Sequence, residues 1–69
     1  MDFRIAELVY ILPKKKSGYI THYYPHYFKE TDCYTVNFKY QNMMVDRLFK
    51  ETELTKLLES ICSDQQNQN

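Results

Sequence analysis

The chain has 69 residues, and its nine basic and nine acidic side chains cancel to a formal net charge of zero. It therefore lacks the overall positive charge that draws proteins to nucleic acid or anionic membranes, although a local patch can still supply one. Hydrophobic residues make up 43% of the chain and aromatic residues 16%, including seven tyrosines and four phenylalanines. This composition predicts one small folded domain with a thin core, because a chain of this length buries only about 60% of its unfolded surface.

The two cysteines, Cys33 and Cys62, lie far apart and form no CxxC motif. We favour two buried free thiols, with one long-loop disulfide as the alternative. No run approaches the roughly 20 apolar residues of a membrane-spanning helix. The first apolar run is short and interrupted by Asp2, Arg4 and Glu7, so it does not resemble a signal peptide. We therefore expect a cytoplasmic protein.

The first apolar run, residues 3–12, is predicted to be a β-strand, with a helix as the alternative. It ends at Pro13 and contains the strand formers Ile5, Val9, Tyr10 and Ile11. Both of its faces are largely apolar, so the strand should be covered on both sides, by the rest of the fold or by a partner.

A loop is predicted at residues 13–18. Its proline fixes one backbone angle, and Gly18, the only glycine of the chain, is expected to supply a positive φ. Lys14, Lys15 and Lys16 repel one another and should lie in water. A solvated hairpin loop is the simplest interpretation, and contact with phosphate or with an acidic partner is the functional one.

Residues 19–28 are predicted to form a second strand. Strict alternation puts Ile20, His22, Tyr24 and Phe28 on one face, and Tyr19, Tyr23 and Tyr27 on the other. Pro25 cannot donate a hydrogen bond to a neighbouring strand, which indicates an edge strand or a bulge at this point. The polar residues 29–32 have the length of a hairpin connection.

The third and fourth strands, residues 33–41 and 43–50, are predicted to form a hairpin. If Gln41 and Asn42 form a two-residue loop, Tyr40 lies opposite Met43. Because Gln-Asn is a poorer turn than Asn-Gly, a longer loop around residues 40–43 is the alternative. The two-residue loop also pairs Phe38 with Val45, Val36 with Arg47, Tyr34 with Phe49, Asn37 with Asp46, and Lys39 with Met44.

The C-terminal part is predicted to be an amphipathic helix. Thr52 is a suitable N-cap, and Glu53 complements the helix dipole in the first turn. A single apolar stripe follows at helical spacing, formed by Leu54, Leu57, Leu58, Ile61 and Cys62.

The predicted fold class is therefore α+β. It is a four-stranded antiparallel meander (β-β-β-β-α) whose C-terminal helix packs on one face of the sheet. Residues 1–63 form the single domain, and residues 64–69 form a flexible polar tail. The covered face bears Tyr34, Val36, Phe38, Val45 and Phe49.

We find no arrangement of residues that predicts catalysis or metal binding. His22 and His26 would lie about 13 Å apart on a strand, too far to share one ion. Ser17 lacks the context of a catalytic nucleophile, and the single glycine leaves no glycine-rich loop for phosphate. We therefore expect a protein that is not an enzyme and that uses no metal and no cofactor.

The tyrosines of the second strand are the most distinctive surface candidates, because tyrosine offers a large, rigid contact area with a polar group at its end. One helix can cover only one face of the sheet, so apolar residues on the other face need a partner or self-association. The predicted partner-binding residues are Tyr19, Tyr23, Tyr24, Tyr27, Tyr10, Lys14, Lys15 and Lys16.

The sequence thus indicates a non-catalytic protein-binding module that acts as a stoichiometric regulator or inhibitor, with a homodimer through the same surface as a variant. Abundant Lys, Asn, Ile and Tyr fit an AT-rich genome and are compatible with a phage-encoded protein directed at a host protein. The alternative is nucleic-acid binding, in which aromatic rings stack on bases and the lysine loop and Lys39 contact phosphates.

Overall fold

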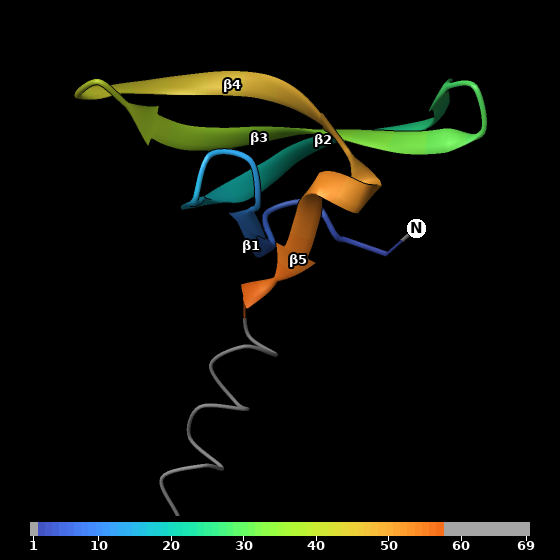
Figure 1. Cartoon of the computed structure of the whole chain (residues 1–69), viewed down its shortest axis with the longest axis horizontal. Helices are drawn as coiled ribbons and strands as arrows, with labels where there is room; N and C mark the ends of the chain where they lie inside the picture. Colours follow the sequence, from blue (N-terminus) through green and yellow to red (C-terminus); the bar gives the residue numbers. More distant parts are fainter. Residues whose placement is uncertain (1, 58–69) are drawn as a thin grey trace, which may run out of the picture.

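The computed structural model describes residues 2–57, which form one antiparallel sheet of five strands (Figure 1). The order across the sheet is β4-β3-β2-β1-β5. A one-turn 3-10 helix, Glu51–Glu53, separates the last two strands. The strands are β1 (Leu8–Ile11), β2 (Lys16–Phe28), β3 (Thr31–Tyr40), β4 (Met43–Lys50) and β5 (Leu54–Lys56).

The predicted α+β fold is wrong, because the chain continues from β4 into a fifth strand. Thr52 lies inside the 3-10 helix, and Leu54 lies opposite Ile11 in the β1–β5 pair. Residues 2–56 contain no α-helix. Leu57 of the predicted apolar stripe is the last described residue and is helical, whereas Leu58 to Cys62 and the predicted tail 64–69 lie outside the described residues. Leu54 is buried as the helix predicted, but it reaches the core from a strand that pairs with β1.

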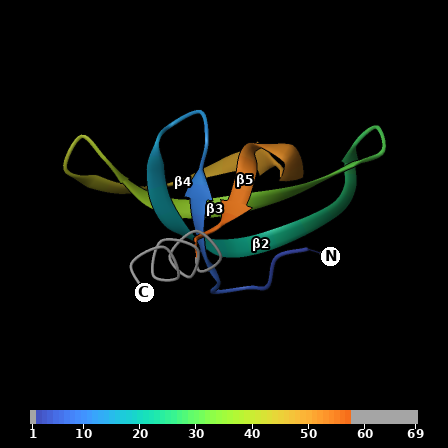
Figure 2. The same ribbon diagram turned by 60° about the horizontal axis from the view of Figure 1, so that its bottom comes forward.

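The long strand β2 holds the two parts of the sheet together. Its first four residues pair with β1, and its part from Tyr19 onward pairs with β3. Two interruptions of the β2–β3 register, at Thr21 and between Tyr24 and Phe28, bend the strand. Figure 2 shows β2 curving so that β1 and β5 lie on one side of the layer formed by β2, β3 and β4. This bend takes the place of the expected helix in covering the sheet.

The core lies on the inner face of this bent sheet, between the layer of β2, β3 and β4 and the pair β1–β5. Phe3 adds to the core from outside the strands, and its ring meets the ring of Tyr34 edge-on at 5.2 Å. The first strand is confirmed only for residues 8–11, because residues 3–7 form an irregular segment in which Ala6 has φ 71. The buried cluster consists of Phe3, Val9, Ile11, Ile20, Tyr34, Val36, Phe38, Phe49 and Leu54.

The hydroxyl of Tyr34 links three parts of the chain at the edge of this core. It accepts hydrogen bonds from the backbone N–H groups of Asp2 at 3.2 Å and Phe3 at 3.4 Å. It donates to the Glu51 carboxylate at 3.2 Å. The ring of Tyr34 is fully buried, so this hydroxyl fastens the N-terminal segment and the start of the 3-10 helix to the middle of the sheet.

Gly18 has a different role from the one predicted. No glycine has a positive φ, and the left-handed residue of the loop is Lys15, with φ 57. Gly18 lies within β2 at a place where the strands approach closely. A Cβ atom there would lie 2.6 Å from the backbone oxygen of Asn37 and 2.7 Å from Cγ1 of Val36. The position therefore requires glycine for lack of space.

The β3–β4 hairpin is confirmed pair by pair. Tyr40 lies opposite Met43, and the ladder continues without a shift to Cys33 opposite Lys50. Gln41 has φ 51 and Asn42 has φ 65, the two positive values of a type I′ turn. The bulge expected at Pro25 is also confirmed, whereas the connection to β3 is shorter than predicted, because β3 begins at Thr31.

Candidate functional site

The bulge at Thr21 divides the tyrosines of β2 between the two faces of the sheet in a way that strict alternation does not predict. Ile20 pairs with buried Val36 on the inner face, whereas His22 pairs with Thr35 on the outer face. After this extra residue, Tyr23 points inward and Tyr24 outward. The predicted set of tyrosines is therefore not one surface.

Tyr23 belongs to the edge of the core. Its ring stacks on that of Tyr34 with centroids 5.1 Å apart, and its hydroxyl donates to the Asp32 carboxylate at 2.8 Å. This hydrogen bond raises the pKa of Tyr23 to about 12. The backbone N–H of His26 also donates to Asp32, and together with Tyr23 it lowers the pKa of that carboxyl group. These contacts hold the β2–β3 hairpin in shape.

The outer face near the β2–β3 hairpin carries an aromatic groove, a cavity of about 140 Å³. Three of its apolar side chains are strongly exposed: Tyr27 at 57%, Phe28 at 51% and Leu48 at 42%. Tyr24 lies beside the groove, with its ring 5.5 Å from that of Tyr27. The groove is lined by Tyr27, Phe28, Cys33, Leu48, Phe49, Lys50 and Glu53.

The charged rim and the thiol of the groove define its chemistry. The ammonium group of Lys50 lies 4.8 Å from the centre of the Phe28 ring, which places a cation beside the exposed aromatic surface. Cys33 is a free thiol and is only 1% exposed, and burial raises its pKa. A thiol held in its neutral form is a poor nucleophile, so the groove offers contact surface with one basic and one acidic side chain, Lys50 and Glu53, in its lining. The expected free thiol is confirmed for Cys33, and Cys62 lies outside the described residues.

The sequence pattern did not bring Phe28 and Leu48 together as a site. The β3–β4 register does so, because Cys33 lies opposite Tyr24 on one side and Lys50 on the other. The pairing of β2 with β3, added to the predicted β3–β4 hairpin, would have predicted that these residues lie together. The bulges of β2 prevent that pairing from being derived from the sequence.

The two other predicted tyrosines lie further along the outer face. Tyr19 is 53% exposed and lies opposite Leu8 on one side and Asn37 on the other. Tyr10 is half-buried in β1, between Ser17 and Thr55. Both belong to the part of the sheet around β1, away from the groove.

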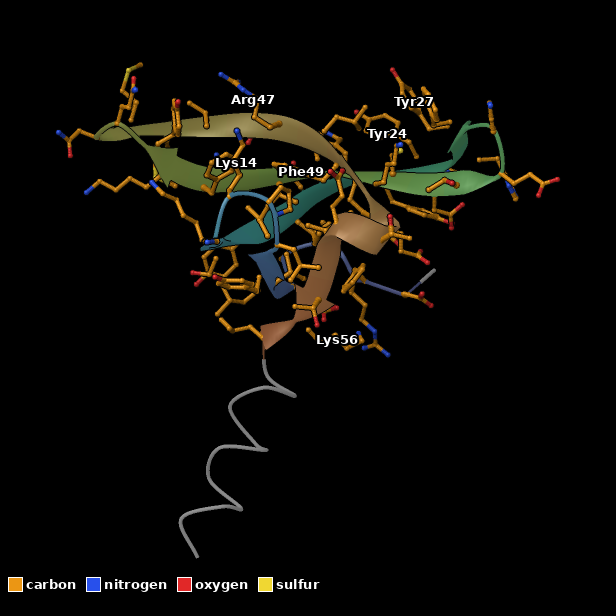
Figure 3. The ribbon with its side chains drawn as sticks, viewed as in Figure 1. Lys14, Tyr24, Tyr27, Arg47, Phe49 and Lys56 are labelled. Carbon is orange, nitrogen blue, oxygen red and sulfur yellow. The ribbon has the colours of Figure 1, made fainter. Side chains whose placement is uncertain are left out.

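Lysines of the loop between β1 and β2 lie around Tyr40, which is not among the predicted site residues. The ammonium groups of Lys14 and Lys16 each lie 5.7 Å from the centre of the Tyr40 ring. The ammonium group of Lys16 also donates to the backbone oxygen of Lys39 at 3.0 Å. Lys15 is exposed at the end of the loop. Figure 3 shows Lys14 well separated from Tyr24 and Tyr27, so the lysines and the groove are two separate surfaces.

Among the described residues, no group of three His, Cys, Asp or Glu side chains could hold a metal ion. No helix within that part of the chain is long and apolar enough to cross a membrane. Comparisons with protein-family models, with curated proteins and with solved structures found no match to this chain.

Proposed function

We propose that this chain is a non-catalytic protein-binding module that acts as a stoichiometric regulator or inhibitor, and that its partner binds in the aromatic groove. The observation that carries this proposal is the exposure of Tyr27, Phe28 and Leu48 around one cavity. The core does not include these side chains, so folding alone does not account for them.

The chemistry of the groove favours a protein partner with an apolar anchor. Burying exposed apolar surface contributes about 25 cal/mol per Å², and aromatic side chains at a cavity are typical energetic centres of protein interfaces. Lys50 and Glu53 of the lining can pair with an acidic and a basic group on the partner. The partner we propose therefore presents an apolar side chain flanked by charged groups, in the cytoplasm of the producing cell or of a host cell.

The test is affinity capture with the tagged full-length chain, followed by titration calorimetry with each captured protein after its purification. Tyr27→Ala and Phe28→Ala should each weaken binding by at least about thirtyfold, the effect of removing an interface centre. Tyr19→Ala is the matched control, because Tyr19 is about as exposed as Tyr27 but lies away from the groove. It should leave the affinity unchanged.

Two results would overturn the proposal. One is a partner whose affinity is equal for the original chain and for both groove variants. The other is a homodimer seen by light scattering that dissociates in the groove variants, because the groove would then be occupied by a second copy. Circular dichroism of every variant shows whether a loss of binding reflects a loss of the fold.

A further inference from the structure

A second surface lies at the opposite end of the molecule from the aromatic groove. It consists of Lys14, Lys16 and Tyr40, with Lys15 in the same loop, and we call it the lysine–tyrosine site. Tyr40 is the last residue of β3 before the β3–β4 turn, whereas Phe28 of the groove precedes the β2–β3 turn. Figures 1 and 2 show these two hairpin turns at opposite ends of the long axis.

Among the described residues, no ion pair links the lysines of this site to an acidic side chain. Within residues 2–57 the structure has one ion pair, between Lys56 and Glu7 at the β1–β5 edge. The two ammonium groups beside Tyr40 repel each other, and the next residue in the loop, Lys15, adds a third charge. An anion bound here would relieve this repulsion, so the zero net charge of the chain conceals a locally basic end.

The site is also held in shape before any ligand binds. The N–H of Lys15 donates to the oxygen of Ile11 at 2.8 Å, which closes the loop, and the N–H of Leu12 donates to the oxygen of Glu53 at 2.9 Å. The ring of Tyr40 packs edge-on against buried Phe38, with centroids 6.4 Å apart. A ring fixed by the core and still 40% exposed offers a firm surface for a flat ligand.

We infer that the lysine–tyrosine site binds single-stranded nucleic acid, with a base against the Tyr40 ring and phosphates on Lys14 and Lys16. Single-stranded nucleic acid is recognised by stacking of bases on aromatic rings next to a positively charged path for the backbone. An acidic peptide would use the lysines but has no need of the ring. The combination of one exposed ring with two ammonium groups therefore favours the nucleic acid.

Fluorescence anisotropy of a short labelled oligothymidylate, titrated with the full-length chain at several salt concentrations, tests this inference. The slope of log affinity against log salt should be about −2 to −3, as expected for three or four phosphates at roughly −0.7 each. Replacing Lys14 and Lys16 together by Ala should make the slope shallower by about 1.4. Lys29→Ala is the matched control, since it removes an exposed lysine of the other hairpin turn.

Tyr40→Leu separates stacking from charge. It keeps an apolar side chain and every lysine, so the salt slope should stay unchanged while the affinity falls roughly five- to hundredfold. Tyr27→Ala, in the groove, should have no effect on this binding. Because the two binding activities are tested by different substitutions, one proposal can be refuted while the other stands.

Three results would overturn the inference. The first is the absence of saturable binding at low salt. The second is an equal loss of affinity in Lys29→Ala and in the double lysine variant, which would indicate attraction by overall charge. The third is binding of a polyglutamate peptide as tight as that of the oligonucleotide, with no effect of Tyr40→Leu, which would assign the site to acidic protein segments instead.

Discussion

Removing the hydroxyl of Tyr34 tests whether this one group holds the N-terminal segment and the start of the 3-10 helix on the middle of the sheet. Tyr34→Phe keeps the ring, so the contacts with Phe3 and Tyr23 remain. It removes an acceptor from the N–H groups of Asp2 and Phe3 and a donor to the Glu51 carboxylate. Because Phe3 is buried, its N–H would be left without a partner.

The expected loss follows from those three contacts. An unpaired buried polar group costs about 1–3 kcal/mol. The distances of 3.2 to 3.4 Å are long for hydrogen bonds, which places this case in the lower half of that range. We therefore expect unfolding to become easier by about 1–2 kcal/mol, which lowers the melting temperature of a domain this small by roughly 5–15 °C.

Urea and thermal denaturation followed by circular dichroism measure this loss. Tyr24→Phe is the matched control, because the Tyr24 hydroxyl makes no side-chain hydrogen bond among the described residues, and its loss should change stability by less than about 0.5 kcal/mol. If the Tyr34 and Tyr24 variants unfold at the same urea concentration, the Tyr34 hydroxyl does not fasten the N-terminal segment and the reasoning fails.

Three further substitutions test the turn, the close contact and the acid at the edge of the core. Gly18→Ala forces a Cβ atom against the Asn37 backbone and should lower the free energy of unfolding, measured in urea, by about 3 kcal/mol or more. Ser17→Ala, next to it, should lower that free energy little. A loss below about 1 kcal/mol in Gly18→Ala would show that the strands can separate. Asn42→Gly suits the φ of 65 at that position and should stabilise the fold by about 0.5 kcal/mol. Glu30→Gly, at a position where φ is not positive, should destabilise the fold. If Glu30→Gly stabilised the fold and Asn42→Gly destabilised it, the assigned turn would be wrong. Burial, with the nearby Asp2 carboxylate, raises the pKa of Glu51 in the folded protein, so stability falls as the pH rises through that raised pKa. Glu51→Gln removes this loss, so the variant should become more stable relative to the original chain as the pH rises from about 4.3 through the raised pKa of Glu51, and a stability difference that does not vary with pH would refute the assignment.

The parts of the fold that the sequence predicts are those in which neighbours in sequence are neighbours in space. The β3–β4 hairpin is an example, because clean alternation and a two-residue loop leave one register that sorts Val36 and Phe38 onto the buried face. The fifth strand is the opposite case. Residues 52–56 fit the first turn of a helix locally, and only pairing with distant β1 makes Leu54–Lys56 a strand. A local sequence pattern contains no information about that long-range pairing.

The faces on which the β2 tyrosines lie were not predicted correctly, and a single extra residue is the reason. One extra residue at Thr21 moves Tyr23 to the core and leaves Tyr24 outside, so strict alternation assigns both tyrosines to the wrong face. Bulges carry no strong sequence signal when no glycine marks them, and Thr21 is a good strand former. Tyr40 was not predicted as a site residue, because Lys14 and Lys16, its neighbours in space, are distant from it in the sequence.

Both proposed surfaces include residues of β2. Its last residues, Tyr27 and Phe28, form one wall of the groove, while its first residue, Lys16, reaches Tyr40. A straight strand would need no bulge at Thr21, and alternation would then turn Tyr24 to the face that holds the core. The two bulges let a thin core be covered by β1 and β5, and the first of them leaves Tyr24 on the outer face beside the groove. Since the two ends share no side chain, binding of one ligand should leave the other surface open, and a ternary complex in which both are occupied is the outcome that this geometry requires.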